Sequence, residues 1–282
     1  MARKTQPLAV GAILLTAVPV LAQDTGDDWD FGADPARDLT IAAMTFENFG
    51  VAVRCVDETL SVVVSGLPQG SGRRSLGWRI GDDPEVQTPW VSPRGSTSAF
   101  AVWPRSVATR LSQGGALEIA ARDGEAIRRY AINIPASDQA VGRVFEACGL
   151  NLRTPESTPP SGESFAGLRW TRPPTPSFPS QMTAPSTGLA ALQCIAHRDG
   201  TLRQCKVESE FPEGAGFGRA AVLGAHRTGR VAATERGQDI SGRSVVFMVR
   251  YGQIEGGWIQ PPPSRLPGRD EVDNPARPED LP

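Results

Sequence analysis

The residues with the most distinctive chemistry in this chain are four cysteines, Cys55, Cys148, Cys194 and Cys205. If the chain is exported, four cysteines are better explained as two disulfide bonds than as free thiols, and three pairings are open. A zinc site formed by Cys194, Cys205 and the two histidines, His197 and His226, is the competing interpretation. Positions 194 and 197 of a strand point to opposite faces, so we expect no metal site.

Other side chains that could take part in catalysis are few and isolated. The acid pairs Asp57-Glu58 and Asp82-Asp83 lie where turns are expected, and solvated carboxylates explain them better than a catalytic dyad does. Arg73-Arg74 and Arg128-Arg129 could bind anionic groups of the envelope, although solvated charges are the simpler interpretation. No motif of a serine hydrolase, metalloprotease, nucleoside triphosphatase or dinucleotide-binding enzyme occurs. We therefore expect no catalytic residue, no cofactor and no enzymatic activity.

The overall charge argues against a nucleic-acid-binding protein. Lys and Arg number 29 against 31 Asp and Glu, which gives a net charge of −2 and no basic excess to neutralise a phosphate backbone. The chain also contains 30 glycines and 25 prolines, which predicts that part of it is linker.

The first 22 residues have the layout of a secretory signal peptide. Arg3 and Lys4 precede an uncharged, mostly apolar run over Leu8–Ala22, with Val20 and Ala22 at the −3 and −1 positions of a cleavage site. A helix over that run would span roughly 22 Å, short of the ~30 Å hydrocarbon core of a bilayer. We expect export to the periplasm and a mature chain that starts at Gln23, with an uncleaved membrane anchor as the alternative.

Residues 39–150, after an acidic lead-in at 23–38, are expected to form a β-rich domain. Short runs of β-branched and aromatic residues separated by turn residues predict an antiparallel sandwich or barrel. The expected strands are Leu39–Phe46, Val51–Val56, Leu60–Ser65, Ser75–Ile80, Ala99–Trp103, Leu117–Ala121 and Ile127–Ile134. Helical spacing is expected over Ser106–Gln113 and in a closing helix over Ser137–Cys148.

The remainder is expected to divide into a Pro-rich linker (151–177), a small second domain (178–256) and a disordered Pro-rich tail (257–282). The second domain has the pattern of a hairpin, a helix and a strand, over Leu192–Val207, about Phe217–Arg227 and Ser244–Tyr251. The predicted fold class of the whole chain is α+β.

The expected hairpin selects a disulfide pairing. Asp199-Gly200 has the turn chemistry, and centring the hairpin there places Cys194 opposite Cys205. A two-residue loop and a four-residue loop over Arg198–Thr201 both satisfy this register. The longer loop is favoured, because it makes the cysteines a non-hydrogen-bonded pair whose side chains approach more closely. The division into domains then pairs Cys55 with Cys148.

A series of short motifs follows in order through residues 178–252. They are Phe178-Pro179, Gly188, the Cys194…Asp199-Gly200…Cys205 hairpin, Phe217-Gly218-x-Ala220-Ala221, Gly237 and Gly242. In order and spacing this stretch resembles the C-terminal domain of TonB-family energy transducers. It departs from the family at Ala232-Ala233, where a proline is usual, and in lacking the family's membrane anchor if residues 1–22 are cleaved.

The resemblance implies binding by strand addition. The family's domain pairs with a short extended segment of an outer-membrane receptor, the TonB box, and an edge strand offers unpaired backbone groups for such pairing. By position the last strand is the candidate edge, with Val245, Phe247, Val249 and Tyr251 as the partner-binding residues. The alternative is a core strand whose edge is capped by the tail.

The first domain more loosely resembles β-rich periplasmic modules of alphaproteobacterial envelope proteins. Arg54-Cys55 on an early strand and Ala147-Cys148 near the last helix carry this resemblance, which supports a bridge between Cys55 and Cys148.

The combined interpretation is a non-enzymatic periplasmic protein that binds an outer-membrane TonB-dependent receptor or another envelope protein, in connection with TonB-dependent transmembrane transport. One alternative is a membrane-anchored TonB-type energy transducer. The other is a structural protein of the cell envelope that binds peptidoglycan or another domain of its own kind. Nucleic acid is not an expected partner, the membrane is one only if residues 1–22 stay attached, and the oligomeric state is left open.

Overall fold

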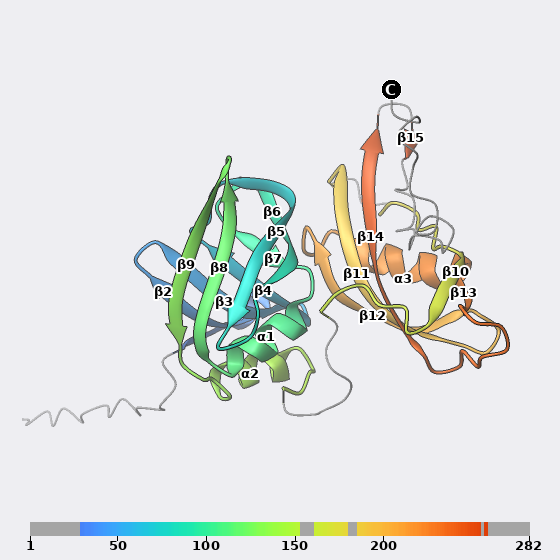
Figure 1. The fold of residues 1–282 in the computed structure, drawn as a ribbon, viewed down its shortest axis with the longest axis horizontal. Helices are drawn as coiled ribbons and strands as arrows, with labels where there is room; N and C mark the ends of the chain where they lie inside the picture. The colour runs from blue at the N-terminus through green and yellow to red at the C-terminus, as the bar shows by residue number, and fades with distance from the viewer. Residues whose placement is uncertain (1–28, 153–160, 180–184, 255–256, 259–282) are drawn as a thin grey trace, which may run out of the picture.

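The computed structural model describes residues 29–152, 161–179, 185–254 and 257–258, so the expected signal peptide and nearly all of the expected tail lie outside the described residues. The described chain forms two units, and both are built mainly from antiparallel β-sheet (Figure 1). Three α-helices occur among the described residues. The predicted α+β class with a β-rich first domain is therefore confirmed.

The first unit contains one antiparallel sheet of nine strands, in the order β1-β2-β3-β4-β7-β6-β5-β8-β9. Their bounds are β1 Asp30–Asp34, β2 Leu39–Phe46, β3 Phe49–Val56, β4 Thr59–Ser65, β5 Gly70–Ile80, β6 Val86–Ser96, β7 Ala99–Ala101, β8 Gly115–Asp123 and β9 Ala126–Ile134. The short strand β7 pairs with both β4 and β6 and so joins the two halves of the sheet.

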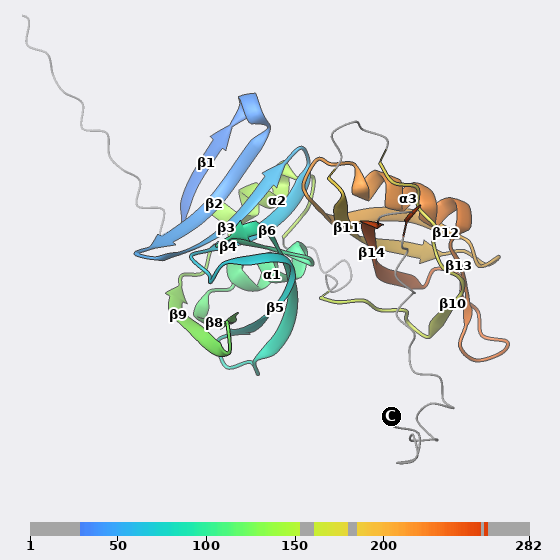
Figure 2. The same ribbon diagram turned by 90° about the horizontal axis from the view of Figure 1, so that it is seen from above.

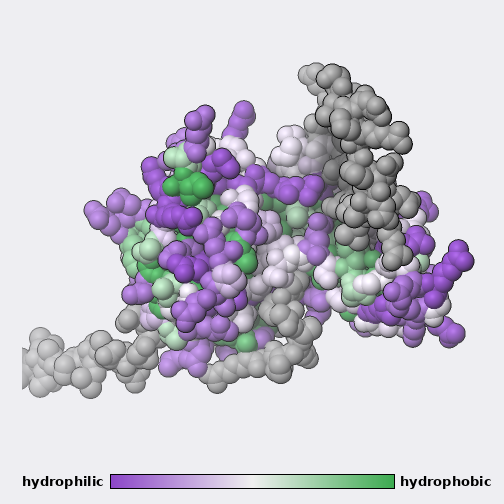
Figure 3. All heavy atoms as spheres, in the orientation of Figure 1, coloured by the Kyte–Doolittle hydropathy of each residue, from purple (hydrophilic) through white to green (hydrophobic). Residues whose placement is uncertain are grey.

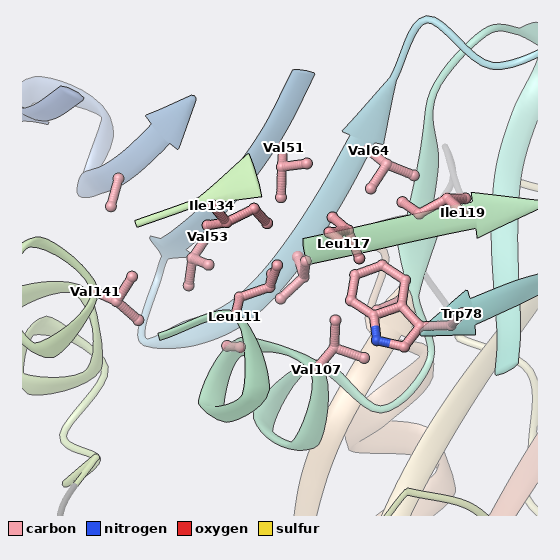
Figure 4. Close-up of a cluster of buried hydrophobic side chains, with 14 of the residues drawn as sticks. Val51, Val53, Val64, Trp78, Val107, Leu111, Leu117, Ile119, Ile134 and Val141 are labelled. Carbon is pink, nitrogen blue, oxygen red and sulfur yellow. The ribbon is translucent and has the colours of Figure 1, made fainter. Parts of the chain in front are cut away.

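This sheet curls around its helices and does not split into two stacked layers (Figure 2). Helix α1 (Pro104–Ser112) lies inside the curl, and α2 (Ala140–Ala147) packs on β2 and β3. Figure 4 shows Val107 and Leu111 of α1 among apolar side chains of the sheet, and all of them are buried in one core. A barrel-like sheet with a closing helix therefore describes the domain better than a sandwich does.

The second unit is a small sheet with a helix on one face. β11 (Thr187–Ala196) and β12 (Leu202–Phe211) form the hairpin, α3 (Phe217–Thr228) packs on both, and β14 (Ser244–Ile254) pairs with β11 on the side away from β12. The strand order is β12-β11-β14-β15, where β15 is Gly257–Trp258. The expected sequence of hairpin, helix and strand is therefore present.

Part of the expected linker belongs to this second unit. Strand β10 (Leu168–Arg172) lies within residues 151–177 and pairs with β13 (Arg230–Ala233). Leu168 is fully buried, and the Trp170 ring packs edge-on against Phe247 with centroids 5.1 Å apart. The prolines flank β10 and do not interrupt it, so proline content alone overestimated the linker.

Two strands of the first unit, β1 and β6, are absent from the sequence-based prediction. β6 contains Pro89 and Pro93, which argue against a strand because proline donates no hydrogen bond to a ladder. β7 pairs with β6 only at Trp90 and Val91. Pro89 therefore has a strand partner on one side only, as in an edge strand, and Pro93 lies in the register shift between Ser92 and Ser96.

Both expected disulfide pairings are present. Cys55 of β3 is bonded to Cys148 at the end of α2, with Cα atoms 5.6 Å apart, and Cys194 is bonded to Cys205, with Cα atoms 4.0 Å apart. The hairpin turn differs from both expected loops, because it occupies all the residues between Ala196 and Leu202. A register shift near Gln204, whose φ is +48°, brings the two cysteines opposite each other.

Replacing Cys55 and Cys148 together with alanine should lower the free energy of unfolding by about 4 kcal/mol, because this bridge closes a segment with a sequence separation of 93. The matched Cys194→Ala, Cys205→Ala variant removes a bridge of separation 11 and should lose about 2–3 kcal/mol. Urea denaturation followed by tryptophan fluorescence measures both losses. A larger loss for the shorter loop would contradict the chain-entropy explanation.

Candidate functional site

The four residues that the sequence marks as partner-binding lie with their side chains in the core of the second unit. Val245, Phe247 and Tyr251 are at most 8% exposed, and Val249 is partly buried against the same cluster. This is the face of β14 that α3 covers. These side chains hold the sheet to the helix, and contacts with a partner at the strand edge would come from other groups.

Tyr251 closes this core beside the start of α3. Its hydroxyl donates to the carbonyl oxygen of Phe217 at 3.0 Å, and its ring lies 4.7 Å from the Phe217 ring and 5.9 Å from that of Phe178. Burial raises the pKa of the Tyr251 phenol well above its usual range, and the carboxylate of Glu210 adds to the rise. Phe178, at the start of the expected domain, is thus part of its core.

The opposite face of the same sheet packs on the first unit. Leu189 and Ala191 of β11 and Val246 of β14 form a buried apolar cluster with three residues of the first unit, Val91, Val102 and Trp103. Phe211 and Met248 pack against this cluster. Both faces of the β11–β14 sheet are therefore covered, one by α3 and one by the first unit.

A buried ion pair fixes this junction. Glu208, whose side chain is 2% exposed, accepts hydrogen bonds from Arg105 Nε at 2.7 Å and from a terminal guanidinium nitrogen at 2.5 Å. Arg105 also donates to Gln193 Oε1 at 2.9 Å, and the Ser209 hydroxyl donates to the carbonyl oxygen of Val102 at 2.6 Å. A register shift in β12 places Glu208 and Ser209 on the same side, so both reach the first unit.

The edge of β14 that faces away from β11 carries a second row of backbone donors and acceptors. Val246 exchanges both of its backbone hydrogen bonds with Ser164, at 2.7 and 2.8 Å, so its polar groups point away from β11. By the alternation of a strand, the backbone groups of Met248, Arg250 and Gly252 point the same way. The sequence marked odd-numbered residues, whereas the outward backbone groups belong to even-numbered ones.

The outward edge of β14 is only partly occupied in the described part of the chain. The Met248 amide donates to Glu163 Oε1 at 2.9 Å, and β15 pairs with Gln253 and Ile254 beyond it. Between these contacts, no described residue bonds to the outward groups of Arg250 or Gly252. The ladder between β14 and β11 is unbroken from Ser244 to Gly252, so the edge is straight and regular.

The other edge of the sheet, β12, is less suited to pairing. Its ladder with β11 is interrupted by two register shifts, one near Gln204 and one near Glu208. Bulges distort the row of backbone donors and acceptors, and natural sheets use them to protect edges. β14 is therefore the edge on which an extended chain can add.

The glycine-rich turn before α3 holds a carboxylate of the protein itself. Glu210 accepts hydrogen bonds from the backbone nitrogens of Gly216, at 3.3 Å, and Gly218, at 2.5 Å. A Cβ at position 218 would lie 2.9 Å from this carboxylate, so glycine permits the approach. The backbone amides with which such a turn could bind an external anion are thus occupied by Glu210.

A cleft at the domain junction, lined by residues such as Ser61, Phe100 and Phe211, has its charged groups already engaged. Glu210 caps α3, and Glu213 pairs with Arg54 at 2.5 Å. Within the described ranges, no cluster of three or more His, Cys, Asp or Glu residues could hold a metal ion. None of the described helices is both long enough and apolar enough to cross a bilayer.

No protein-family model, curated protein or solved structure matches the chain.

Replacing Arg105 with alanine should lower the free energy of unfolding by about 3–5 kcal/mol, because Glu208 would remain buried without its partner. The double variant Arg105→Ala, Glu208→Ala should lose less than Arg105→Ala alone. Arg110→Ala, on the same helix, removes a half-exposed pair with Asp83 and should cost less than about 1 kcal/mol. Equal losses for Arg105→Ala and Arg110→Ala in urea denaturation would contradict the role of the buried pair.

The Tyr251 phenol should stay protonated in the folded protein at pH values where a free tyrosine ionises, about pH 10. Because the unfolded chain releases this proton and the folded chain does not, folding stability should fall as the pH rises above about 10. Absorbance titration of the Tyr130→Phe variant, which leaves Tyr251 as its one tyrosine, measures this. We expect phenolate absorbance to appear together with loss of structure, and ionisation of a folded chain near pH 10 would overturn the interpretation.

Proposed function

We propose that this chain is a periplasmic binding protein whose second unit pairs, along the outer edge of β14, with extended segments of outer-membrane transport receptors or other envelope proteins. The observation that carries the proposal is a regular strand whose two faces are buried and whose outward backbone groups are partly unpaired among the described residues. An extended peptide can complete such a ladder, with main-chain hydrogen bonds as the main source of affinity.

The chain's own contact at this edge supports the same chemistry. Ser164 binds Val246 by the paired backbone hydrogen bonds that an added antiparallel strand would form. The order of hairpin, helix and strand is the one that the resemblance to TonB C-terminal domains implies. That resemblance favours the TonB box of a receptor as the extended segment and transport across the outer membrane as the process served.

The two disulfides support the proposed location. All four cysteines are paired, one bond within each unit, and such bonds persist in oxidising compartments such as the periplasm. Together with the signal-peptide pattern of residues 1–22, this favours export. The first unit then serves as the platform that covers one face of the β11–β14 sheet, and it forms no backbone hydrogen bond with the outward edge of β14 among the described residues.

The test is a pull-down of the full chain with immobilised TonB-box peptides, using variants at Gly252 in β14. Gly252→Pro removes an outward amide without removing a hydrogen bond to β11, whereas Gly252→Ala keeps the amide and its Cβ meets nothing within 4 Å. We expect the wild type and Gly252→Ala to bind, and Gly252→Pro to bind at least about tenfold more weakly. Binding no stronger than to scrambled peptides would contradict the receptor assignment, and unchanged binding by Gly252→Pro would contradict strand addition.

A further inference from the structure

The outer edge of β14 already holds a carboxylate supplied by the chain itself. Glu163 Oε1 accepts a hydrogen bond from the backbone amide of Met248 at 2.9 Å. The next residue, Ser164, forms the paired backbone hydrogen bonds with Val246. Both Glu163 and Ser164 are exposed, so this contact is a short bridge on the surface and not part of a core. The bridge shows what the edge accepts: antiparallel backbone with an acidic side chain over Met248.

Two arginines from different units point toward this position. Arg250 lies two residues beyond Met248 in β14 and so shares its face of the sheet. Arg73 of β5 is the cross-strand partner of Val91, whose side chain packs with Val246 in the junction. Directly opposite residues share a face, so Arg73 points to the same junction. On the face drawn in Figure 3, hydrophilic side chains meet at the upper end of the junction between the two units.

Electrostatic interactions link the three groups. Partial burial lowers the pKa of Arg73, the positive charge of Arg250 lowers it further, and the carboxylate of Glu163 acts in the opposite direction. Arg73 and Arg250 are therefore close enough to repel each other, and Glu163 is close enough to both strands to offset part of that repulsion.

The positive charge is not neutralised within the described part of the chain. Neither Arg73 nor Arg250 forms an ion pair there, and Arg250 Nε is buried with no hydrogen-bond partner. A buried donor left unpaired is destabilising, and more so when it is charged. Glu163 therefore leaves guanidinium donors unpaired at this edge, and these donors suit a further carboxylate.

This charge also decides among possible occupants of the edge. Two copies of this chain paired antiparallel along β14 and centred on Arg250 would place the two Arg250 residues opposite each other, and like charges across a pair of strands are destabilising. A neutral strand would leave the Arg250 donor unpaired. A strand that carries a carboxylate both completes the ladder and pairs with the guanidinium groups.

We propose that the β14 edge selects extended peptides with an acidic residue, bound between Arg73 and Arg250, and that such a peptide displaces the chain's own Glu163–Ser164 bridge. The inference rests on the proposed strand addition and adds the chemical class of the partner. The first unit then contributes Arg73 to specificity, in addition to covering the sheet.

The test uses a variant, called the opened variant, in which residues 163 and 164 no longer bond to the β14 edge, and adds the peptide as a separate molecule. Glu163→Ala with Ser164→Pro removes the carboxylate and the amide that donates to Val246, at two exposed positions. The probe is a synthetic peptide of residues 161–170, Ser-Gly-Glu-Ser-Phe-Ala-Gly-Leu-Arg-Trp, and the matched probe has glutamine in place of the glutamate. NMR titration of the isotope-labelled full chain reports affinity and location through the amides of Val246, Met248 and Arg250.

We expect the opened variant to bind the acidic probe at least about tenfold more tightly than the glutamine probe, with shifts concentrated at those three amides. Adding Arg73→Gln and Arg250→Gln should abolish the preference. The control pair Arg122→Gln and Arg128→Gln makes the same charge change on the β8–β9 hairpin and should preserve it. The wild type, whose edge is occupied, should bind both probes more weakly than the opened variant.

Equal affinity for the two probes, with the same amides shifting, would overturn the selection of acidic strands and leave strand addition standing. Failure of both probes to bind the opened variant, or shifts confined to other strands, would overturn the inference and the proposed function together. Loss of the preference in the Arg122→Gln, Arg128→Gln control would show an effect of net charge and so would also contradict the assignment to Arg73 and Arg250.

Discussion

The β11–β14 sheet has both of its faces buried, and the rest of the structure follows from that constraint. α3 covers one face, where its Phe217 packs against Tyr251 of β14, and the first unit covers the other through Val91, Val102 and Trp103. Most side chains of this strand are therefore buried, and those that are only partly buried, such as Arg250, lie beside the junction. The pairing that we propose uses the backbone along an edge, where unpaired donors and acceptors favour an added strand.

The junction between the units determines which edge is usable and what lies beside it. The buried Arg105–Glu208 pair and the apolar cluster around Val246 hold β14 next to the β5–β6 hairpin. That arrangement brings Arg73 of one unit to Arg250 of the other. A proline-rich connection would suggest two independent domains. The contacts that hold the two units together come instead from strands and from α1.

Local chemistry made much of this fold predictable. Asp199-Gly200 located the hairpin and the Cys194–Cys205 bond, and the alanine-rich run after Phe217 located α3. Proline content misled the prediction at β10, where Leu168 is buried, and β6, which contains Pro89 and Pro93, was absent from the expected strands. The ion pair between Arg105 and Glu208 joins residues 103 positions apart and needs a bulge in β12, and neither leaves a sequence signal.

The partner-binding role of the last strand stays a prediction, and the side chains that the sequence marked on it are buried, whereas its outward backbone groups belong to the other set of residues. Alternation in β14 separates odd from even residues, but sequence alone does not say that α3 covers Phe247 while Val246 bonds outward to Ser164. The sequence identified Arg73 as a possible anion-binding residue but favoured a solvated charge. Arg250, which interacts with Arg73 in the folded chain, is distant from it in sequence. The missing information was the tertiary contact.

The most direct test of the central claim is residue-resolved hydrogen exchange of the β14 amides in the full chain, with and without a saturating receptor-derived peptide. The outward amide of Arg250, which no described residue bonds, should exchange rapidly in the free protein and become protected when the peptide binds. The inward amide of Phe247, within the ladder to β11, should be protected in both states. Protection that appears elsewhere while Arg250 continues to exchange rapidly would contradict the assignment of β14 as the binding edge.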